Sequence, residues 1–133
     1  MSHPSKAKGS TFESHCRDFF MAFFGWRIER MPAGSSIDRG DLVGLPDVAV
    51  ECKNAARLEL AAWVDETVRE ARNANCRWPL LVVKRRGKGS AGDAYAVMKL
   101  SDWADLYREA VRWLGHTIRC RNCGHVMKIE DAA

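Results

Sequence analysis

The stretch DLVGLPDVAVECK, residues 41–53, decides the predicted fold. A Pro-Asp turn divides it, and its second half, residues 48–53, alternates its side chains like a strand. Because successive side chains of a strand point to opposite faces, Glu51 and Lys53 share one face. Asp41 opens the preceding strand, so these three charged side chains are expected to converge at one place.

Two carboxylates and a lysine form a donor set that suits phosphodiester hydrolysis. Carboxylate oxygens bind hard divalent cations, and such a cation polarises a phosphate and lowers the pKa of a bound water. The lysine can orient the water and offset charge that develops on the phosphate. Two alternatives stay open. An E-x-K strand is often a solvated face with a weak ion pair, and Asp38 or Asp47 is close enough in sequence to replace Asp41.

Upstream of this stretch, residues 10–24 carry apolar side chains at helical spacing, which predicts an amphipathic helix buried on one face. Ser10 and Glu13 have the spacing of a capping box at its start, and Gly25 is placed to end it. Residues 1–9 are polar and basic without periodicity, so a flexible lead-in is expected there.

Downstream, the periodicity predicts a helix, two strands and a further helix. Their expected ranges are residues 60–75, 80–84, 94–100 and 101–114, with a basic, glycine-rich loop over residues 85–92. With an additional strand at residues 26–30, the element order becomes α-β-β-β-α-β-β-α. We therefore expect one α/β domain over residues 10–115, in which helices flank a central mixed sheet. Residues 116–133 are expected to form a short C-terminal appendix.

The composition bounds the class of protein. With 133 residues, of which 47% are hydrophobic, the chain suits one globular domain. Its longest apolar run falls short of the roughly 20 residues that span a bilayer, and its polar start lacks a signal-peptide core, so a cytoplasmic protein is expected. Five cysteines without regular spacing favour reduced thiols. A net charge of +4 permits a polyanionic partner without requiring one.

A helical Glu13, followed by Asp41 and then by Glu51-Cys52-Lys53 within an α-β-β-β-α-β order, resembles the PD-(D/E)XK nuclease superfamily. Within that superfamily, the opening KGSTFE at residues 8–13 looks most like archaeal-type Holliday-junction resolvases and their phage relatives. So does the loop with Arg30 and Ser35-Ser36. The sequence departs from the family pattern at Gly40, where the motif often has proline.

The resemblance implies a restriction-endonuclease-like fold and a catalytic site. Asp41 and Glu51 would ligate Mg²⁺ or Mn²⁺, the Cys52 backbone carbonyl would add a ligand, and Lys53 would be the catalytic lysine. Glu13 would complete the acidic cluster, although the capping box alone also accounts for a glutamate there.

The function implied is a metal-dependent endonuclease that resolves four-way DNA junctions as a homodimer, since symmetric incision needs two sites and the chain carries one. A phage-encoded chain would act in the host cytoplasm. Two alternatives stay open. One is an exonuclease, or a nicking or restriction-like nuclease, on duplex or single-stranded DNA. The other is a non-catalytic DNA-binding module.

Candidate DNA contacts come from two parts of the chain. The resemblance points to Lys8, Ser10, Arg30 and Ser35, and the basic segment after the fourth predicted strand adds Lys84, Arg85, Arg86 and Lys88. Lysine and arginine side chains at a strand end can bind phosphates. The same basic segment could equally be a solvated hairpin without a function.

A second candidate metal site lies in the C-terminal appendix. The segment contains Cys120-x-x-Cys123-Gly124, which is the pattern of a zinc knuckle, with His116 and His125 on either side. A structural zinc needs four ligands, so the expected site uses these four residues or is half of a Cys₄ site shared with a second chain. Two free surface thiols are the alternative.

Overall fold

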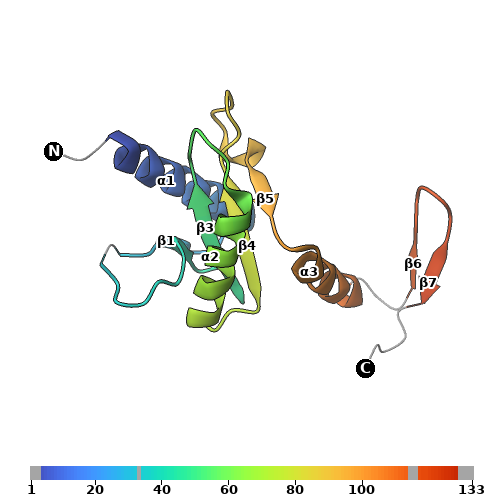
Figure 1. The fold of residues 1–133 in the computed structure, drawn as a ribbon. Coiled ribbons are helices and arrows are strands. Elements are labelled where there is room, and N and C mark those ends of the chain that lie inside the picture. The colour runs from blue at the N-terminus through green and yellow to red at the C-terminus, as the bar shows by residue number, and fades with distance from the viewer. Residues whose placement is uncertain (1–3, 33, 114–116, 129–133) are drawn as a thin grey trace. The chain divides into compact units, whose positions relative to one another are not determined.

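The computed structural model describes residues 4–32, 34–113 and 117–128. The chain divides into two compact units, Met1–Met98 and Lys99–Ala133 (Figure 1). The first unit contains the sheet. The second contains helix α3 (Leu100–Trp113) and an antiparallel hairpin of β6 (Thr117–Arg119) and β7 (Val126–Lys128). The sequence predicts a division after residue 115, whereas the compact units divide before α3.

A five-stranded mixed sheet forms the first unit, as predicted for a restriction-endonuclease-like fold. Its strands follow the order of the chain: β1 (Glu29–Arg30), β2 (Leu42–Val43), β3 (Val48–Lys53), β4 (Trp78–Val83) and β5 (Tyr95–Val97). Only β3 and β4 pair in parallel, and helix α2 (Leu60–Asn73) makes the crossover between them. All other neighbours are antiparallel. A 3₁₀ turn, η1 (Ala91–Asp93), precedes β5.

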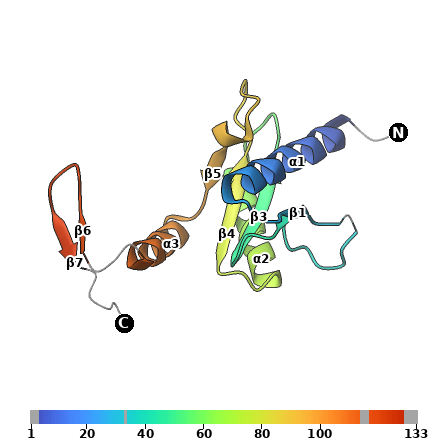
Figure 2. The ribbon, with the colours of Figure 1, turned by 180° about the vertical axis from the view of Figure 1, so that it is seen from behind.

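Helices α1 (Pro4–Phe24) and α2 cover opposite faces of the sheet, as the two opposed views show (Figures 1 and 2). Beneath α1 lies the main apolar cluster, which consists of Phe12, Cys16, Ile28, Leu42, Val50, Cys52 and Val82. Beneath α2 lies a smaller cluster of Trp63, Leu81 and Val83. Glu51 is level with Leu81 in the parallel pair, so its side chain points toward α2.

Helix α1 begins at Pro4, six residues before the predicted start at Ser10. Residues 4–9, expected as a flexible lead-in, form its first turns, and proline suits the first helical position because its missing N–H needs no partner there. Ser10 therefore lies inside the helix, and the predicted capping box is wrong. Gly25 ends the helix with a φ of +70°, as predicted.

The apolar stripe of α1 is buried along only part of its length. Phe12 and Cys16 are fully buried, whereas Phe23 near the C-terminus of the helix is 71% exposed. The aromatic rings there stack on one another, with 5.8 Å between the Phe19 and Phe23 centroids. The predicted burial on one face therefore holds along only part of the helix, because periodicity shows which side of a helix is apolar and not how far its covering partner extends.

Within the described ranges, no helix is both long enough and apolar enough to span a membrane.

Candidate active site

Asp41 is held beside β3 by the backbone that precedes it. Gly40 has a φ of +90°, and a Cβ at this position would lie 2.7 Å from the carbonyl oxygen of Val50. Only glycine allows this close approach, which lets the Asp41 N–H donate a 2.7 Å hydrogen bond to the same oxygen. Because Leu42 pairs with Val50, Asp41 falls level with Glu51.

The Asp41 and Glu51 carboxyls lie within hydrogen-bonding reach of each other. Asp41 Oδ2 also accepts a 2.8 Å hydrogen bond from the Cys52 N–H. Burial raises the pKa of Asp41 from 3.8 to about 7, and the neighbouring Glu51 charge adds to the shift. Burial likewise raises the pKa of Glu51 from 4.5 to about 7, against the opposing hydrogen bond from Lys53.

Lys53 lies between two carboxylates, one from its own strand and one from α2. Its Nζ is 2.7 Å from Glu51 Oε1 and 2.8 Å from Glu66 Oε2. Burial alone would lower the pKa of this lysine, but the two carboxylates outweigh burial and raise the pKa above its ordinary value. The side chain is therefore an ammonium at neutral pH and donates hydrogen bonds.

Cys52 links the candidate site to the core. Its thiol points into the apolar cluster, where the hydrogen bond with Cys16 and burial raise its pKa and keep it neutral. Its backbone N–H lies in the plane of the sheet and points toward Asp41. Since the N–H and C=O of one strand residue point to the same side, the Cys52 carbonyl also faces the Asp41 edge.

Glu13 reaches the same neighbourhood from α1. Its Oε2 accepts hydrogen bonds from Nε and Nη2 of Arg30, at 3.0 and 2.6 Å, and its charge contributes to the raised pKa of Asp41. A pocket of about 430 Å³ is lined by these residues and by several others that the sequence singled out: Ser10, Glu13, Arg30, Ser35, Asp38 and Asp41. Residues of α1 and of the stretch 30–41 thus face one hollow beside Asp41.

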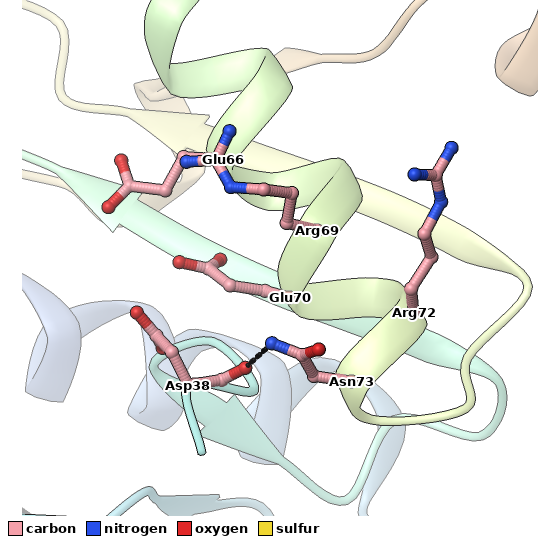
Figure 3. A pocket seen from close by; sticks show the side chains of 6 residues that line it. All are labelled: Asp38, Glu66, Arg69, Glu70, Arg72 and Asn73. Atoms are coloured by element: carbon pink, nitrogen blue, oxygen red, sulfur yellow. Dashed lines mark hydrogen bonds between the residues drawn. The ribbon is translucent and has the colours of Figure 1, made fainter. Parts of the chain in front are cut away.

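The two alternative aspartates make other contacts, although Asp38 lines the same pocket as Asp41. Asp47 has a φ of +61° in the turn before β3, and its Oδ1 accepts a 2.7 Å hydrogen bond from the Arg77 N–H. This contact gives Asp47 a structural role in the turn. Asp38 faces α2 rather than Glu51, and its carbonyl accepts a 2.7 Å hydrogen bond from Asn73 Nδ2 (Figure 3).

Two acidic residues of α2, Glu66 and Glu70, were missed from the sequence. Glu70 is only 2% exposed and lies two helical turns after Trp63, on the side of α2 that faces the sheet. Burial raises its pKa from 4.5 to about 7, and Asp38 and Glu66 add to the shift. A glutamate seven residues after a buried tryptophan was the available signal in the sequence.

The predicted DNA contacts divide into residues beside the site and residues at its margin. Ser10, Arg30 and Ser35 line the pocket next to Asp41. Lys8 and Lys84 line a neighbouring pocket of about 320 Å³. Lys84 Nζ donates to the Lys88 carbonyl at 2.7 Å, and Arg86 Nη2 donates to the Ala56 carbonyl at 2.6 Å. The Arg85 guanidinium lies 6.0 Å from the centroid of the Tyr95 ring.

In the second unit, the C-terminal hairpin presents two exposed cysteines on a tight turn. The Gly124 N–H donates to the Cys120 carbonyl and the Cys120 N–H donates to the His125 carbonyl, both at 2.8 Å. The pKa of the Cys120 thiol is lowered, chiefly by the Cys123 backbone N–H. His116, the fourth expected ligand, lies outside the described residues.

A mixed sheet with helices on both faces and an acidic cluster beside β3 fits the nucleases of the restriction-endonuclease-like class. A family model described as "Phage putative PDDEXK endonuclease" matches residues 4–123. The chain belongs to this family, and family membership supports nuclease activity with DNA as the substrate. No match was found among curated proteins or among solved structures.

Proposed function

We propose that the chain is a divalent-metal-dependent DNA endonuclease that cuts branched DNA and resolves four-way junctions as a homodimer. The observation that supports it most directly is the convergence of Asp41, Glu51 and Lys53, with a buried carboxyl pair next to a charged lysine. An ion pair on a solvated face would not need two carboxyls within reach of each other.

The donor set fits a hard cation. Asp41 and Glu51 offer carboxylate oxygens, the Cys52 carbonyl faces the same edge, and no cysteine sulfur points into the described cluster. These three residues would hold Mg²⁺ or Mn²⁺, which supplies a polarised phosphate and a more acidic water. Two carboxyls whose pKa values are raised by burial regain their charged form when a cation binds them.

Lys53 acts beside this pair as a hydrogen-bond donor. Since its pKa is raised, it does not accept a proton from water at neutral pH. Its ammonium can instead donate to a phosphate oxygen on which negative charge grows during cleavage. The Glu51 and Glu66 carboxylates hold it in place for this role.

The DNA backbone would follow the basic residues around the site. Arg30 and Ser35 line the pocket next to Asp41, and Lys8 and Lys84 extend the positive surface. The pairing of Arg30 with Glu13 ties one phosphate-binding candidate to the acidic cluster, so Glu13 positions Arg30. Basic contacts of this kind hold the backbone without reading the base sequence.

Cleavage of labelled four-way junction, matched linear duplex and single strand in Mg²⁺ or Mn²⁺ tests the function. Parent protein is compared with Glu51→Gln and with Glu59→Gln, which removes an exposed charge outside the site. Paired nicks near the crossover, lost only in Glu51→Gln, support the proposal. Equal cutting of all three substrates indicates a general nuclease, and tight binding without cutting indicates a DNA-binding module.

The hairpin supports a proposal about assembly. The turn that presents Cys120 and Cys123 suits tetrahedral thiolate ligation, and two chains together would supply a Cys₄ zinc site. Protein purified without added zinc should contain half an equivalent per chain and scatter light as a dimer. Cys120→Ser should lose the zinc, and Cys76→Ser should keep it. One equivalent per chain indicates a site within one chain with His116 and His125, and none leaves two free thiols.

A further inference from the structure

We propose that Asp38, Glu66 and Glu70 form a second site for a hard divalent cation, separate from the Asp41–Glu51 pair. Asp38 comes from the loop before β2, and the two glutamates come from successive turns of α2. The inference does not depend on the proposed cleavage of DNA, because it concerns cation binding by a different set of side chains.

The three carboxylates meet in a pocket of about 270 Å³. One oxygen of each residue can be chosen so that all three lie within 4.8 Å of one another. Figure 3 shows the carboxylate groups pointing into the same space from α2 and from the facing loop. A cation placed among them would bind one oxygen from each side chain and complete its shell with water.

Glu70 supplies the independent reason to expect a ligand. Its side chain is 2% exposed, and neither of its carboxylate oxygens has a hydrogen-bond donor among the residues that the structure describes. The Glu51 carboxyl lies within reach and can donate to Glu70 only while Glu51 is protonated; when both groups are ionised, neither can donate. A buried carboxylate without a donor is unfavourable unless it is protonated or neutralised by a cation.

Basic side chains neutralise the cluster only in part. Lys53 is shared between Glu51 and Glu66, so one ammonium serves two carboxylates. Arg69 and Arg72 line the pocket, and Figure 3 shows Arg72 extending away from the carboxylates. Within the described part of the chain, neither arginine forms an ion pair with Asp38 or Glu70.

The donor set indicates the type of ion. Three carboxylates with water favour Mg²⁺, Mn²⁺ or Ca²⁺, whereas zinc prefers nitrogen and sulfur ligands that this pocket lacks. Glu66 joins the two sites, because one of its oxygens already binds Lys53. A cation on Glu66 would therefore compete with the ammonium and leave Lys53 more firmly with Glu51.

Titration with Mn²⁺ in the absence of DNA, with free Mn²⁺ measured by electron paramagnetic resonance, tests the site. The parent protein should bind two Mn²⁺ per chain. Asp38→Asn should bind one, and so should Glu51→Gln, because each removes a ligand from a different site. Asparagine keeps the oxygen that accepts from the Gly40 N–H, so the loop is preserved. Asp65→Asn is the matched control on α2 and should still bind two.

Two results would overturn the inference. If Asp38→Asn binds as many ions as the parent, Asp38 is not a ligand. If the parent binds one ion and both Asp38→Asn and Glu51→Gln lose it, the carboxylates form a single merged site.

Thermal unfolding gives a second measurement. Glu70→Gln should be more stable than the parent in chelator, and Mn²⁺ should stabilise it less than it stabilises the parent. If the parent protein binds two Mn²⁺ per chain but does not cleave DNA, the proposed function is contradicted and the second cation site is supported.

Discussion

The two faces of strand β3 differ in character. Toward α1, β3 presents Val50 and Cys52, which are buried among apolar side chains. Toward α2, the neighbouring residues Glu51 and Lys53 join a network of charged groups. On β3, one face therefore packs into the main apolar cluster, and the other presents charged groups that suit chemistry beside the smaller apolar cluster beneath α2. Because they alternate residue by residue, substitutions one position apart should have different consequences.

The largest effect is expected from Lys53→Met, on the charged face. This change removes the ammonium that would offset charge on the phosphate, so cleavage should fall by roughly 10²- to 10³-fold. Single-turnover cleavage with saturating enzyme measures it. Lys99→Met, which removes a lysine from the second unit, is the control. An unchanged cleavage rate in Lys53→Met would show that the charged face does not take part in the reaction.

On the apolar face, Leu42→Ala should lower the free energy of unfolding by about 2 to 5 kcal/mol, because Leu42 is 1% exposed and leaves a cavity. Urea unfolding measures the loss. Molecules that remain folded should still bind Mn²⁺ with the stoichiometry of the parent. A loss of Mn²⁺ binding in the folded fraction would contradict the separation of the two faces.

Gly40→Ala should disturb both faces at once. The added Cβ would meet the Val50 carbonyl oxygen at 2.7 Å in a left-handed backbone, so a loss of roughly 2 kcal/mol in stability and a displaced Asp41 are expected. Gly25→Ala is the matched control, since Gly25 also has a positive φ but nothing lies within 4 Å of the added atom. Equal losses of stability in Gly40→Ala and Gly25→Ala would mean that the left-handed backbone, and not the contact with the Val50 carbonyl oxygen, causes the loss.

The last effect is a pH dependence of stability that arises from the carboxyl groups of the charged face. Asp41, Glu51 and Glu70 have folded-state pKa values of about 7, above their ordinary values of 3.8 to 4.5. The folded state therefore binds protons more tightly than the unfolded state between about pH 4 and 7, and stability should fall as pH rises through this window. We expect the free energy of unfolding to decline over this window in chelator, measured by urea unfolding. Saturating Mn²⁺ should abolish it, and a decline that persists would contradict this assignment.

The sequence predicts the elements whose pattern is local. The bounds of β3 agree with the prediction because six residues alternate without interruption. The end of α1 agrees because only a residue that tolerates positive φ fits there. The start of α1 was misjudged, since Ser10 and Glu13 have the right spacing for a cap but Glu13 instead pairs with Arg30, seventeen residues away.

The spacing of Glu70 from Trp63 indicates its side of α2, but the contacts of the α2 glutamates with β3 could not be predicted by the same reasoning. A glutamate on a helix is normally solvated, and nothing local shows that Glu66 and Glu70 lie above Lys53 and Glu51. That contact depends on how the crossover helix packs on β3 and β4, which is a tertiary property. Asp38 was likewise noted only as a rival of Asp41, because the loop path that carries it to α2 has no periodicity.

The alternation of β3 also makes the proposed catalytic pair depend on correct folding. A slip of one residue in its pairing would send Glu51 and Lys53 into the apolar cluster and expose Val50 and Cys52 to the acidic side chains. A chain that mispairs in this way loses its core and its carboxylate pair together. In the proposed nuclease, strand registration therefore prevents a misfolded chain from presenting Glu51 and Lys53 together, so that cutting of cellular DNA would require a complete fold.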